Sequence, residues 1–462
     1  MSMNRLFLYG PPASGKTTVG RALARALGVK FVDTDLLVCQ AEGCNISEIF
    51  ATRGEECFRD AESRALAEAC AIEEPCVVAL GGGTLLRSAN RELAEKSGAV
   101  ICIDAPDEAE LEARILAGEV VRPLGNKAKE RAPHYASFPI RLSRFFLLDD
   151  SLVLAGEGLA QTIVGGEKLV TDENVLKFHP ELAPGTVFTM PSGEEHKTPA
   201  TIMQMWSAFA QAGLGRRDRV VAVGGGVTGD MTGFAAATWM RGIDWINVPT
   251  TLLSMVDAST GGKTGCDLPE GKNLAGAFHS PKLVVIDTDF LSTLPPEVMK
   301  CGLAEMIKHW AIGGKKEFAR AVPDATEIAG NLSVKVEIVR EDPFEKLGRR
   351  MLLNCGHTIG HAVEKASGYR LSHGEAVAIG CVAEARMAVR LGLAPTGWPD
   401  EFAARFAQAG LPVELPAGMS LESLRDIMRG DKKRAGSTVT FTLPCGWGDV
   451  RAVKIDLSGD LP

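Results

Sequence analysis

The chain of 462 residues is too long for one hydrophobic core, and its composition, 45% hydrophobic and 23% charged, is ordinary for a soluble globular protein. Its formal net charge of −8 argues against a nucleic-acid binder, and no apolar run approaches the roughly 20 residues of a membrane span. Eleven scattered cysteines without a paired framework favour reduced thiols, so we expect a cytoplasmic protein of two or three domains that acts on small molecules.

The first predicted element is a buried strand at residues 5–9. It leads into Gly10-Pro11-Pro12-Ala13-Ser14-Gly15-Lys16-Thr17, which fits the phosphate-binding pattern G-x-x-x-x-G-K-[ST], and a helical pattern follows from residue 18. Glycines let the backbone N–H groups face phosphate oxygens, while the lysine reaches the transferred phosphoryl group and the threonine can bind Mg²⁺. The complete pattern between a strand and a helix predicts an ATP site that includes Gly10, Gly15, Lys16 and Thr17.

Further motifs follow the loop within the first 140 residues. They are Phe31–Asp35, Gly54–Arg59, Leu80–Gly83, Val121–Leu124 and Arg131–Tyr135. In this order they resemble shikimate kinase, a small P-loop kinase with a parallel sheet. The resemblance implies that ATP, with Mg²⁺, phosphorylates shikimate.

The same resemblance assigns roles to individual residues. Asp33 would lie near the Mg²⁺ together with Thr17, and Arg114 would contact ATP. Asp35 would hold the acceptor hydroxyls and take up a proton, while Arg122 on the lid would neutralise charge on the transferred group. Arg59 and Arg131 would clamp the shikimate carboxylate, because the guanidinium fork binds carboxylates bidentately. Gly82 and Gly83 would line the same pocket.

The kinase-like segment departs from the family pattern in its lid. Only residues 123–130 separate Arg122 from Arg131, which is shorter than usual. A shortened lid would exclude water less well and could slow phosphoryl transfer. An inactive module that senses shikimate or a nucleotide is therefore the alternative for this segment.

The junction carries no linker rich in proline, serine or glycine, so we expect the units to abut. Residues 140–150 are predicted to close the kinase sheet, and residues 152–158 are predicted to form a tight turn between strands. The expected domains are residues 1–150, 151–290 and 291–462.

A second glycine loop follows a predicted strand at residues 219–223. The loop is Gly224-Gly225-Gly226-Val227-Thr228-Gly229-Asp230, and a helical pattern continues through Ala237. A glycine loop between a strand and a helix can bring a pyrophosphate against backbone N–H groups. Alone it is a moderate signal, because such turns also serve simply for packing.

Three of the eight histidines fall within residues 357–373. His357 and His361 are four residues apart, so on a helix they share one face, and His373 follows in Leu371–Glu375. Upstream, Glu305 and Lys308 occur in Gly302–Lys308. Two imidazoles, one carboxylate and a spare imidazole are the parts of a catalytic zinc site with an open position, which suggests chemistry at a hydroxyl or carbonyl carbon.

Motifs between about residues 165 and 440 closely resemble 3-dehydroquinate synthase. They are the second glycine loop, Trp239–Gly242, Pro249–Asp257, Gly261–Thr264, Gly271–Leu274, the Glu305/Lys308 segment, both histidine motifs and Asp431–Lys433. The resemblance implies an α/β nucleotide-binding lobe followed by a mostly helical metal-binding lobe, with the active site between them. It also implies a homodimer formed through this unit.

The resemblance implies the site residues as follows. Zn²⁺, or Co²⁺, would be held by Glu305, His357 and His373, with His361 acting in proton transfer beside the catalytic Lys263 and Lys308. NAD would contact Asp172, Asn174, Glu194, Lys197, Gly225, Gly226, Val227, Asp230, Thr250, Thr251, Lys272 and Thr293. The phosphorylated substrate would contact Arg241 (from the neighbouring subunit), Asp257, Lys263, Asn273, Lys308, Lys335, Arg350, Asn354 and Lys432.

The implied substrate is 3-deoxy-D-arabino-heptulosonate 7-phosphate, which carries a carboxylate and a phosphate and therefore needs a pocket rich in lysine and arginine. NAD would take a hydride and return it during conversion to 3-dehydroquinate and phosphate. Two departures are visible: the strands before Asp172 are expected to be trimmed, and Arg340–Glu345 differs from the usual acidic loop. Another sugar phosphate cyclase, or a metal-dependent polyol dehydrogenase, is the alternative within enzymes.

Overall fold

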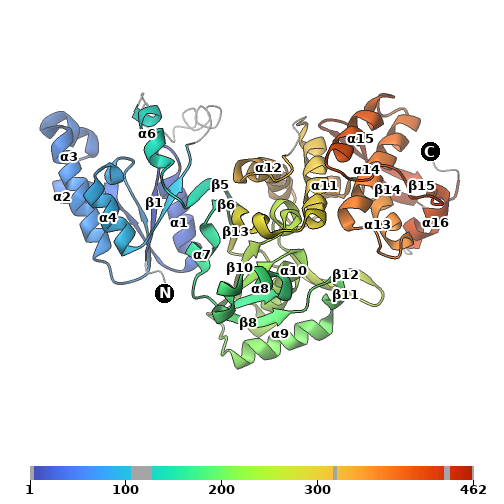
Figure 1. Cartoon of the computed structure of the whole chain (residues 1–462), viewed down its shortest axis with the longest axis horizontal. Helices are drawn as coiled ribbons and strands as arrows, with labels where there is room; N and C mark the ends of the chain where they lie inside the picture. The colour runs from blue at the N-terminus through green and yellow to red at the C-terminus, as the bar shows by residue number, and fades with distance from the viewer. Residues whose placement is uncertain (1–4, 106–126, 316–319, 431–437, 460–462) are drawn as a thin grey trace.

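The computed structural model describes residues 5–105, 127–315, 320–430 and 438–459. One eleven-stranded sheet runs through the molecule in the order β2-β3-β1-β4-β5-β6-β13-β10-β9-β7-β8. Figure 1 shows the amino-terminal unit and a helical lobe at opposite ends, with a second α/β unit between them. Among the described residues, no helix is long and apolar enough to cross a membrane.

The amino-terminal unit is a parallel sheet covered by helices, as the sequence predicts. Its strands are β1 (Arg5–Tyr9), β2 (Lys30–Asp33), β3 (Cys76–Ala79) and β4 (Ala99–Ile103). Its helices are α1 (Lys16–Leu27), α2 (Thr34–Glu42), α3 (Ile46–Cys70), α4 (Ser88–Ser97) and α6 (Lys127–Tyr135). The predicted strand at residues 5–9 and the helix after the glycine loop are confirmed.

The junction is a hairpin that joins the strands of the amino-terminal unit to those of the second α/β unit within the one sheet. Strand β5 (Arg141–Leu147) pairs in parallel with β4 and antiparallel with β6 (Leu152–Glu157), so it closes the kinase sheet as predicted. The predicted tight turn at residues 152–158 is wrong: most of this segment is β6, which also pairs in parallel with β13. The turn lies instead at Leu148–Ser151, where the backbone N–H of each of these two residues donates to the carbonyl oxygen of the other.

The misprediction has a physical reason. Gly156 resembles a turn residue, but a Cβ there would lie 1.9 Å from the carbonyl oxygen of Arg141 on the paired strand. Glycine is therefore present because two backbones approach closely within the sheet. The trimming of the strands before Asp172 stays a prediction; β5 and β6 stand immediately before α7 (Leu159–Val164).

The second α/β unit continues the sheet with parallel pairs. Its further strands are β7 (Leu169–Asp172), β8 (Thr186–Met190), β9 (Arg219–Gly224), β10 (Asp244–Pro249) and β13 (Leu283–Asp287). Its helices are α8 (Glu173–Phe178), α9 (Pro199–Gln211) and α10 (Gly226–Thr238). A separate hairpin, β11 (Lys263–Leu268) with β12 (Gly271–Phe278), projects toward the helical lobe (Figure 1).

The last unit is mostly helical. Its helices are α11 (Pro296–Gly313), α12 (Ala325–Glu341), α13 (His357–Ala366), α14 (His373–Arg390), α15 (Trp398–Gln408) and α16 (Leu421–Gly430). A hairpin of β14 (Thr438–Gly446) and β15 (Asp449–Asp456) packs against α14. Helices α11, α13 and α14 carry the residues of the predicted metal site.

Candidate active sites

The first glycine loop lies at the carboxyl end of β1, where backbone conformations require glycine: φ is 143° at Gly10 and 88° at Gly15. The Lys16 ammonium donates to the carbonyl oxygens of Gly10, at 3.0 Å, and Pro11, at 2.7 Å. Burial lowers the pKa of Lys16 to about 8. The loop thus holds the Lys16 ammonium against its own carbonyl oxygens, on the turn that is predicted to bind phosphate.

The predicted magnesium residues are in direct contact. The Thr17 hydroxyl donates to Asp33 Oδ2 at 2.9 Å, while Asp33 Oδ1 accepts from the backbone N–H of Asp35 at 3.0 Å. Asp33 therefore caps α2 and fixes the position of Asp35. Arg114 and Arg122 lie outside the described residues.

The predicted acceptor residues gather around the end of β3. A Cβ on Gly83 would lie 2.3 Å from Arg59 Nη1, so a larger residue would force this guanidinium to shift. The Tyr135 hydroxyl donates to the carbonyl oxygen of Gly82 at 2.7 Å, which brings α6, and with it Arg131, to the same end. No sequence motif points to Glu62, a buried carboxylate that pairs with Arg59.

The second glycine loop opens onto a cavity of about 490 Å³, here called the glycine-loop cavity. It lies at the carboxyl ends of β7, β9 and β10 and at the start of α10, where ligands bind in open parallel sheets. Eight of the residues predicted to contact a dinucleotide line it: Asp172, Asn174, Gly225, Gly226, Val227, Thr250, Thr251 and Thr293. Glu194, Lys197, Asp230 and Lys272 do not.

Two of the remaining residues, Lys197 and Asp230, form an ion pair with each other. The buried Lys197 ammonium donates to Asp230 Oδ2 and to Asn273 Oδ1, each at 2.7 Å. Asp172 has a local structural role as well, because it accepts from the N–H of Val175 at the start of α8. The first two bonds join α10 to β12, and the third caps α8.

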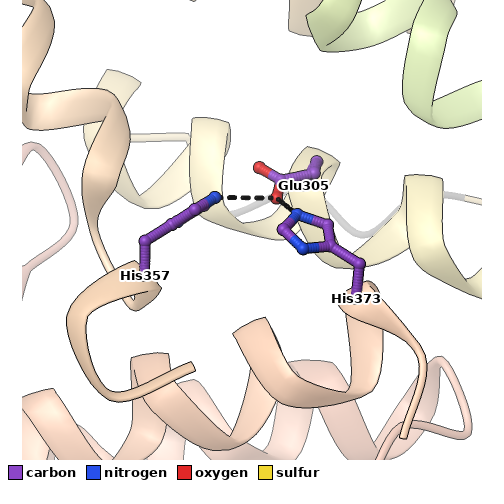
Figure 2. Close-up of side chains that lie close together, drawn as sticks. All are labelled: Glu305, His357 and His373. Carbon is purple, nitrogen blue, oxygen red and sulfur yellow. Dashed lines mark ion pairs between the residues drawn. The ribbon is translucent and has the colours of Figure 1, made fainter. Parts of the chain in front are cut away.

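The predicted metal ligands converge from three helices. The Nε2 atoms of His357 and His373 lie 3.6 and 3.3 Å from the same atom, Glu305 Oε1, and Figure 2 shows both rings directed at this carboxylate. The three side chains offer ligand atoms within 4.8 Å of one another. His361 does not join this group, and its ring centroid lies 5.2 Å from that of His357.

The electrostatics of these groups suit a bound cation. Glu305 is fully buried; burial alone would raise its pKa, but Lys308 and His357 hold it well below its usual range. Burial and the nearby Lys308 charge lower the pKa of His357 to about 3, so this imidazole is neutral. Burial opposes protonation of His373 too, yet the carboxylates of Glu305 and Glu364 raise its pKa to about 10.

The donor set fits a divalent transition metal. One carboxylate and two imidazoles are zinc and cobalt ligands, and they leave a coordination position open. In the described part of the chain neither oxygen of the buried Glu305 has a hydrogen-bond partner of good geometry, although Lys308 forms an ion pair with it. His357 Nδ1 lies 3.0 Å from the carbonyl oxygen of Cys355, which directs Nε2 toward Glu305.

A cavity of about 640 Å³, here called the histidine cavity, adjoins the metal ligands. Lys335 pairs with Asp257 inside it, and Arg350 donates to the carbonyl oxygens of Gly261, at 3.0 Å, and Pro343, at 2.7 Å. Most of the predicted substrate and catalytic residues line it: Asp257, Lys263, Asn273, Lys308, Lys335, Arg350, Asn354 and His361. Arg241 does not line it, and Lys432 lies outside the described residues.

The structure also brings in four side chains that the sequence did not reveal. Glu345 lines the histidine cavity and pairs with Lys263. Glu364 lies 3.7 Å from His373 Nδ1 and 3.0 Å from the Lys272 ammonium, so it links a metal ligand to β12. Glu384 and His309 are fully buried beside the site. Glu364 contacts His373 and Glu384 contacts Gly356, both of which belong to the histidine motifs. The distances along the sequence between these partners follow no recognised motif.

Together, the fold and the sites define a P-loop phosphotransferase joined to a dinucleotide- and metal-dependent enzyme of phosphorylated polyols. Comparison with known families agrees. Residues 12–152 match shikimate kinase, residues 187–301 match the 3-dehydroquinate synthase N-terminal family and residues 302–434 its C-terminal family.

Curated relatives and solved structures support the same assignment. A 3-dehydroquinate synthase of Synechococcus sp. is 47% identical over 277 residues, which cover 57% of this chain and 75% of the relative. A 2-deoxy-scyllo-inosose synthase complexed with carbaglucose-6-phosphate, NAD+ and Co2+ is 26% identical, with a TM-score of 0.60, and covers 68% of this chain and 97% of that chain. A 2-epi-5-epi-valiolone synthase of Streptomyces hygroscopicus with NAD+ and Zn2+ bound gives 26% identity and a TM-score of 0.58, covering 68% of this chain and 94% of that chain.

The chain belongs to the 3-dehydroquinate synthase family and carries a shikimate kinase unit before the synthase. It therefore combines two activities of the shikimate pathway: phosphorylation of shikimate by ATP, and conversion of 3-deoxy-D-arabino-heptulosonate 7-phosphate to 3-dehydroquinate and phosphate. The alternative of a different cyclase or a polyol dehydrogenase is not favoured, because identity to the synthase is far higher than to the two other cyclases.

Proposed function

We propose that Glu305, His357 and His373 hold Zn²⁺, or Co²⁺, and that NAD occupies the glycine-loop cavity with its pyrophosphate at the start of α10. The convergence of two imidazoles on one buried carboxylate is the observation that carries this proposal. A bound metal supplies Lewis acidity at the substrate hydroxyl, and NAD supplies reversible hydride transfer. The two cyclase structures with bound NAD+ and Co2+ or Zn2+ support the cofactor pair.

The side chains of the histidine cavity bind and orient the heptulosonate phosphate. Lys263, Lys335 and Arg350 supply positive charge for its phosphate and carboxylate, and Arg350 is held in place by two backbone carbonyl oxygens. Lys308 keeps Glu305 ionised from inside the site. His361 stands on the same face of α13 as His357 and moves protons to or from the substrate.

In the kinase unit, Lys16 binds the phosphates of ATP, while Thr17 and Asp33 hold Mg²⁺. Arg59 and Arg131 clamp the shikimate carboxylate, and Asp35 orients the hydroxyl that is phosphorylated. Phosphoryl transfer depends chiefly on positioning and positive charge, which this arrangement supplies without covalent catalysis.

The wider organisation is part of the proposal. The domains run at residues 1–150, 151–290 and 291–462, with the hairpin of β5 and β6 at the first boundary. Arg241 is exposed, has a positive φ of 70° and lines neither cavity. A homodimer would carry it into the histidine cavity of the partner. The net charge and the eleven free thiols are consistent with a cytoplasmic location.

The test is incubation of the purified chain with the heptulosonate phosphate, NAD and Zn²⁺. The expected result is release of inorganic phosphate with a dehydroquinate product and no net NADH. Accumulation of NADH without phosphate would indicate a dehydrogenase and contradict the proposal. His357→Ala should abolish phosphate release and leave ATP binding unchanged, because its side chain belongs to the metal site alone.

A further inference from the structure

Glu384, on α14, is a fully buried carboxylate near the metal site. It accepts the backbone N–H of Gly356 at 2.7 Å and that of Ile359 at 3.3 Å. In the described part of the chain, backbone N–H groups and not a cationic side chain face this carboxylate. Burial raises the pKa of this carboxyl group to about 8, and the backbone N–H groups act in the opposite direction because they favour its ionised form.

These N–H groups belong to the first turn of α13, which begins at His357. The first N–H groups of a helix have no partner inside the helix, and the helix dipole places partial positive charge there. Gly356 occupies the N-cap position in a left-handed conformation and offers no side chain as a cap. Glu384 therefore caps α13 from a neighbouring helix.

The two helices are also in close backbone contact at this point. A Cβ on Gly356 would lie 2.3 Å from the Cys381 sulfur, and one on Gly380 would lie 2.0 Å from the carbonyl oxygen of Gly356. Helix α14 begins at the metal ligand His373 and also carries Glu384, which caps α13. Helix α13 in turn begins at the other histidine ligand, His357. The cap and the close packing together fix the separation of the two imidazoles.

We infer that Glu384 is a positioning residue of the metal site: it fixes the first turn of α13 so that His357 Nε2 remains directed at Glu305. The inference rests on the proposed metal site and adds a residue that touches neither metal nor substrate. Glu384→Gln keeps the side-chain shape but replaces one acceptor oxygen by a donor that faces N–H groups. His357 should then lose its fixed direction while the rest of the chain is unchanged.

The experiment measures Co²⁺ binding to the metal-free chain by its visible absorption, with shikimate kinase turnover in the same sample as an internal control. Glu384→Gln should weaken Co²⁺ binding by about 10- to 100-fold, as loss of groups that support metal ligands commonly does, and should alter the absorption bands. Kinase turnover should stay within about twofold. Glu327→Gln is the matched control, because it removes a capping carboxylate from α12, which carries none of the three proposed metal ligands.

Each outcome decides the inference. Unchanged Co²⁺ affinity and absorption in Glu384→Gln would overturn it, and so would unfolding of the metal-free synthase unit, which would give Glu384 a general structural role. Equal weakening in Glu327→Gln would overturn it as well. A wild-type chain that binds no Co²⁺ would refute the proposed function, and with it this inference.

Discussion

Glu305 and Lys308 form an ion pair at the centre of the synthase, with relative exposures of 0% and 1%. Glu305→Gln leaves the ammonium buried without its main partner, which typically costs about 3–5 kcal/mol of unfolding free energy. We expect the lower end, about 3 kcal/mol, because Asp257 also stabilises the Lys308 charge. Lys308→Met should cost a similar amount, because it removes the charge that contributes most to keeping the buried carboxylate ionised.

The double variant distinguishes a coupled pair from two independent side chains. With Glu305→Gln and Lys308→Met together, no unpaired charge remains from the pair, so the cost should fall to about 1 kcal/mol and not rise to the sum of the single variants. Urea unfolding of the metal-free chain, kept in chelator, is the assay. Tryptophan fluorescence reports the synthase alone, since all six tryptophans follow residue 200. Additive losses in the double variant would refute the reasoning.

Three further predictions concern the kinase and the junction. Burial lowers the pKa of Lys16 to about 8, and bound phosphate must raise this pKa again, so ATP binding takes up a proton above that pH. The ATP affinity measured by calorimetry should therefore fall by up to about tenfold per pH unit above pH 8. A constant ATP affinity up to about pH 9.5 would contradict this prediction. Gly83→Ala should displace Arg59 and raise the KM for shikimate by about 10- to 100-fold without changing ATP affinity; an unchanged KM would show that Arg59 does not bind shikimate. Cutting the chain between Asp150 and Ser151 should leave two halves that co-purify and that melt at lower temperature when separated, since β5 pairs with β4 on one side of the cut and with β6 on the other. Separated halves with undiminished melting temperatures would contradict the shared strand.

The parts of the sites that the sequence predicted are those encoded by local motifs. The loop from Gly10 to Thr17 carries its glycines, lysine and hydroxyl on one turn, so the strand before it and the helix after it suffice to predict its geometry. His357 and His373 begin two successive helices and are close in the chain. Their convergence on Glu305, about fifty residues earlier, was implied only by family resemblance.

The parts that the sequence did not predict depend on contacts between distant backbone atoms. Glu384 acts through N–H groups 25 to 28 residues earlier in the chain, and any buried helix can carry such a carboxylate without a recognisable pattern. The strand β6 was mistaken for a turn because Gly156 is required by the approach of β5, which no local pattern reveals. Propensity and motif rules describe neighbours in sequence, so both features required the fold.

The arrangement of the units bears on how the two activities relate. The kinase loop belongs to the amino-terminal unit, whereas the histidine cavity is lined by the second α/β unit and by the helical lobe at the opposite end of the molecule (Figure 1). The two reactions are not expected to be consecutive, and no direct handover between the sites is expected. The shared strand β5 joins the units structurally.

The most direct test of the account is an anomalous-scattering measurement at the zinc edge on crystals of the wild-type chain grown with Zn²⁺. The account predicts one strong peak bounded by Glu305 Oε1 and the Nε2 atoms of His357 and His373, and its absence in His357→Ala. A wild-type map without a peak at this position, or with zinc bound only at other groups, would contradict the central claim.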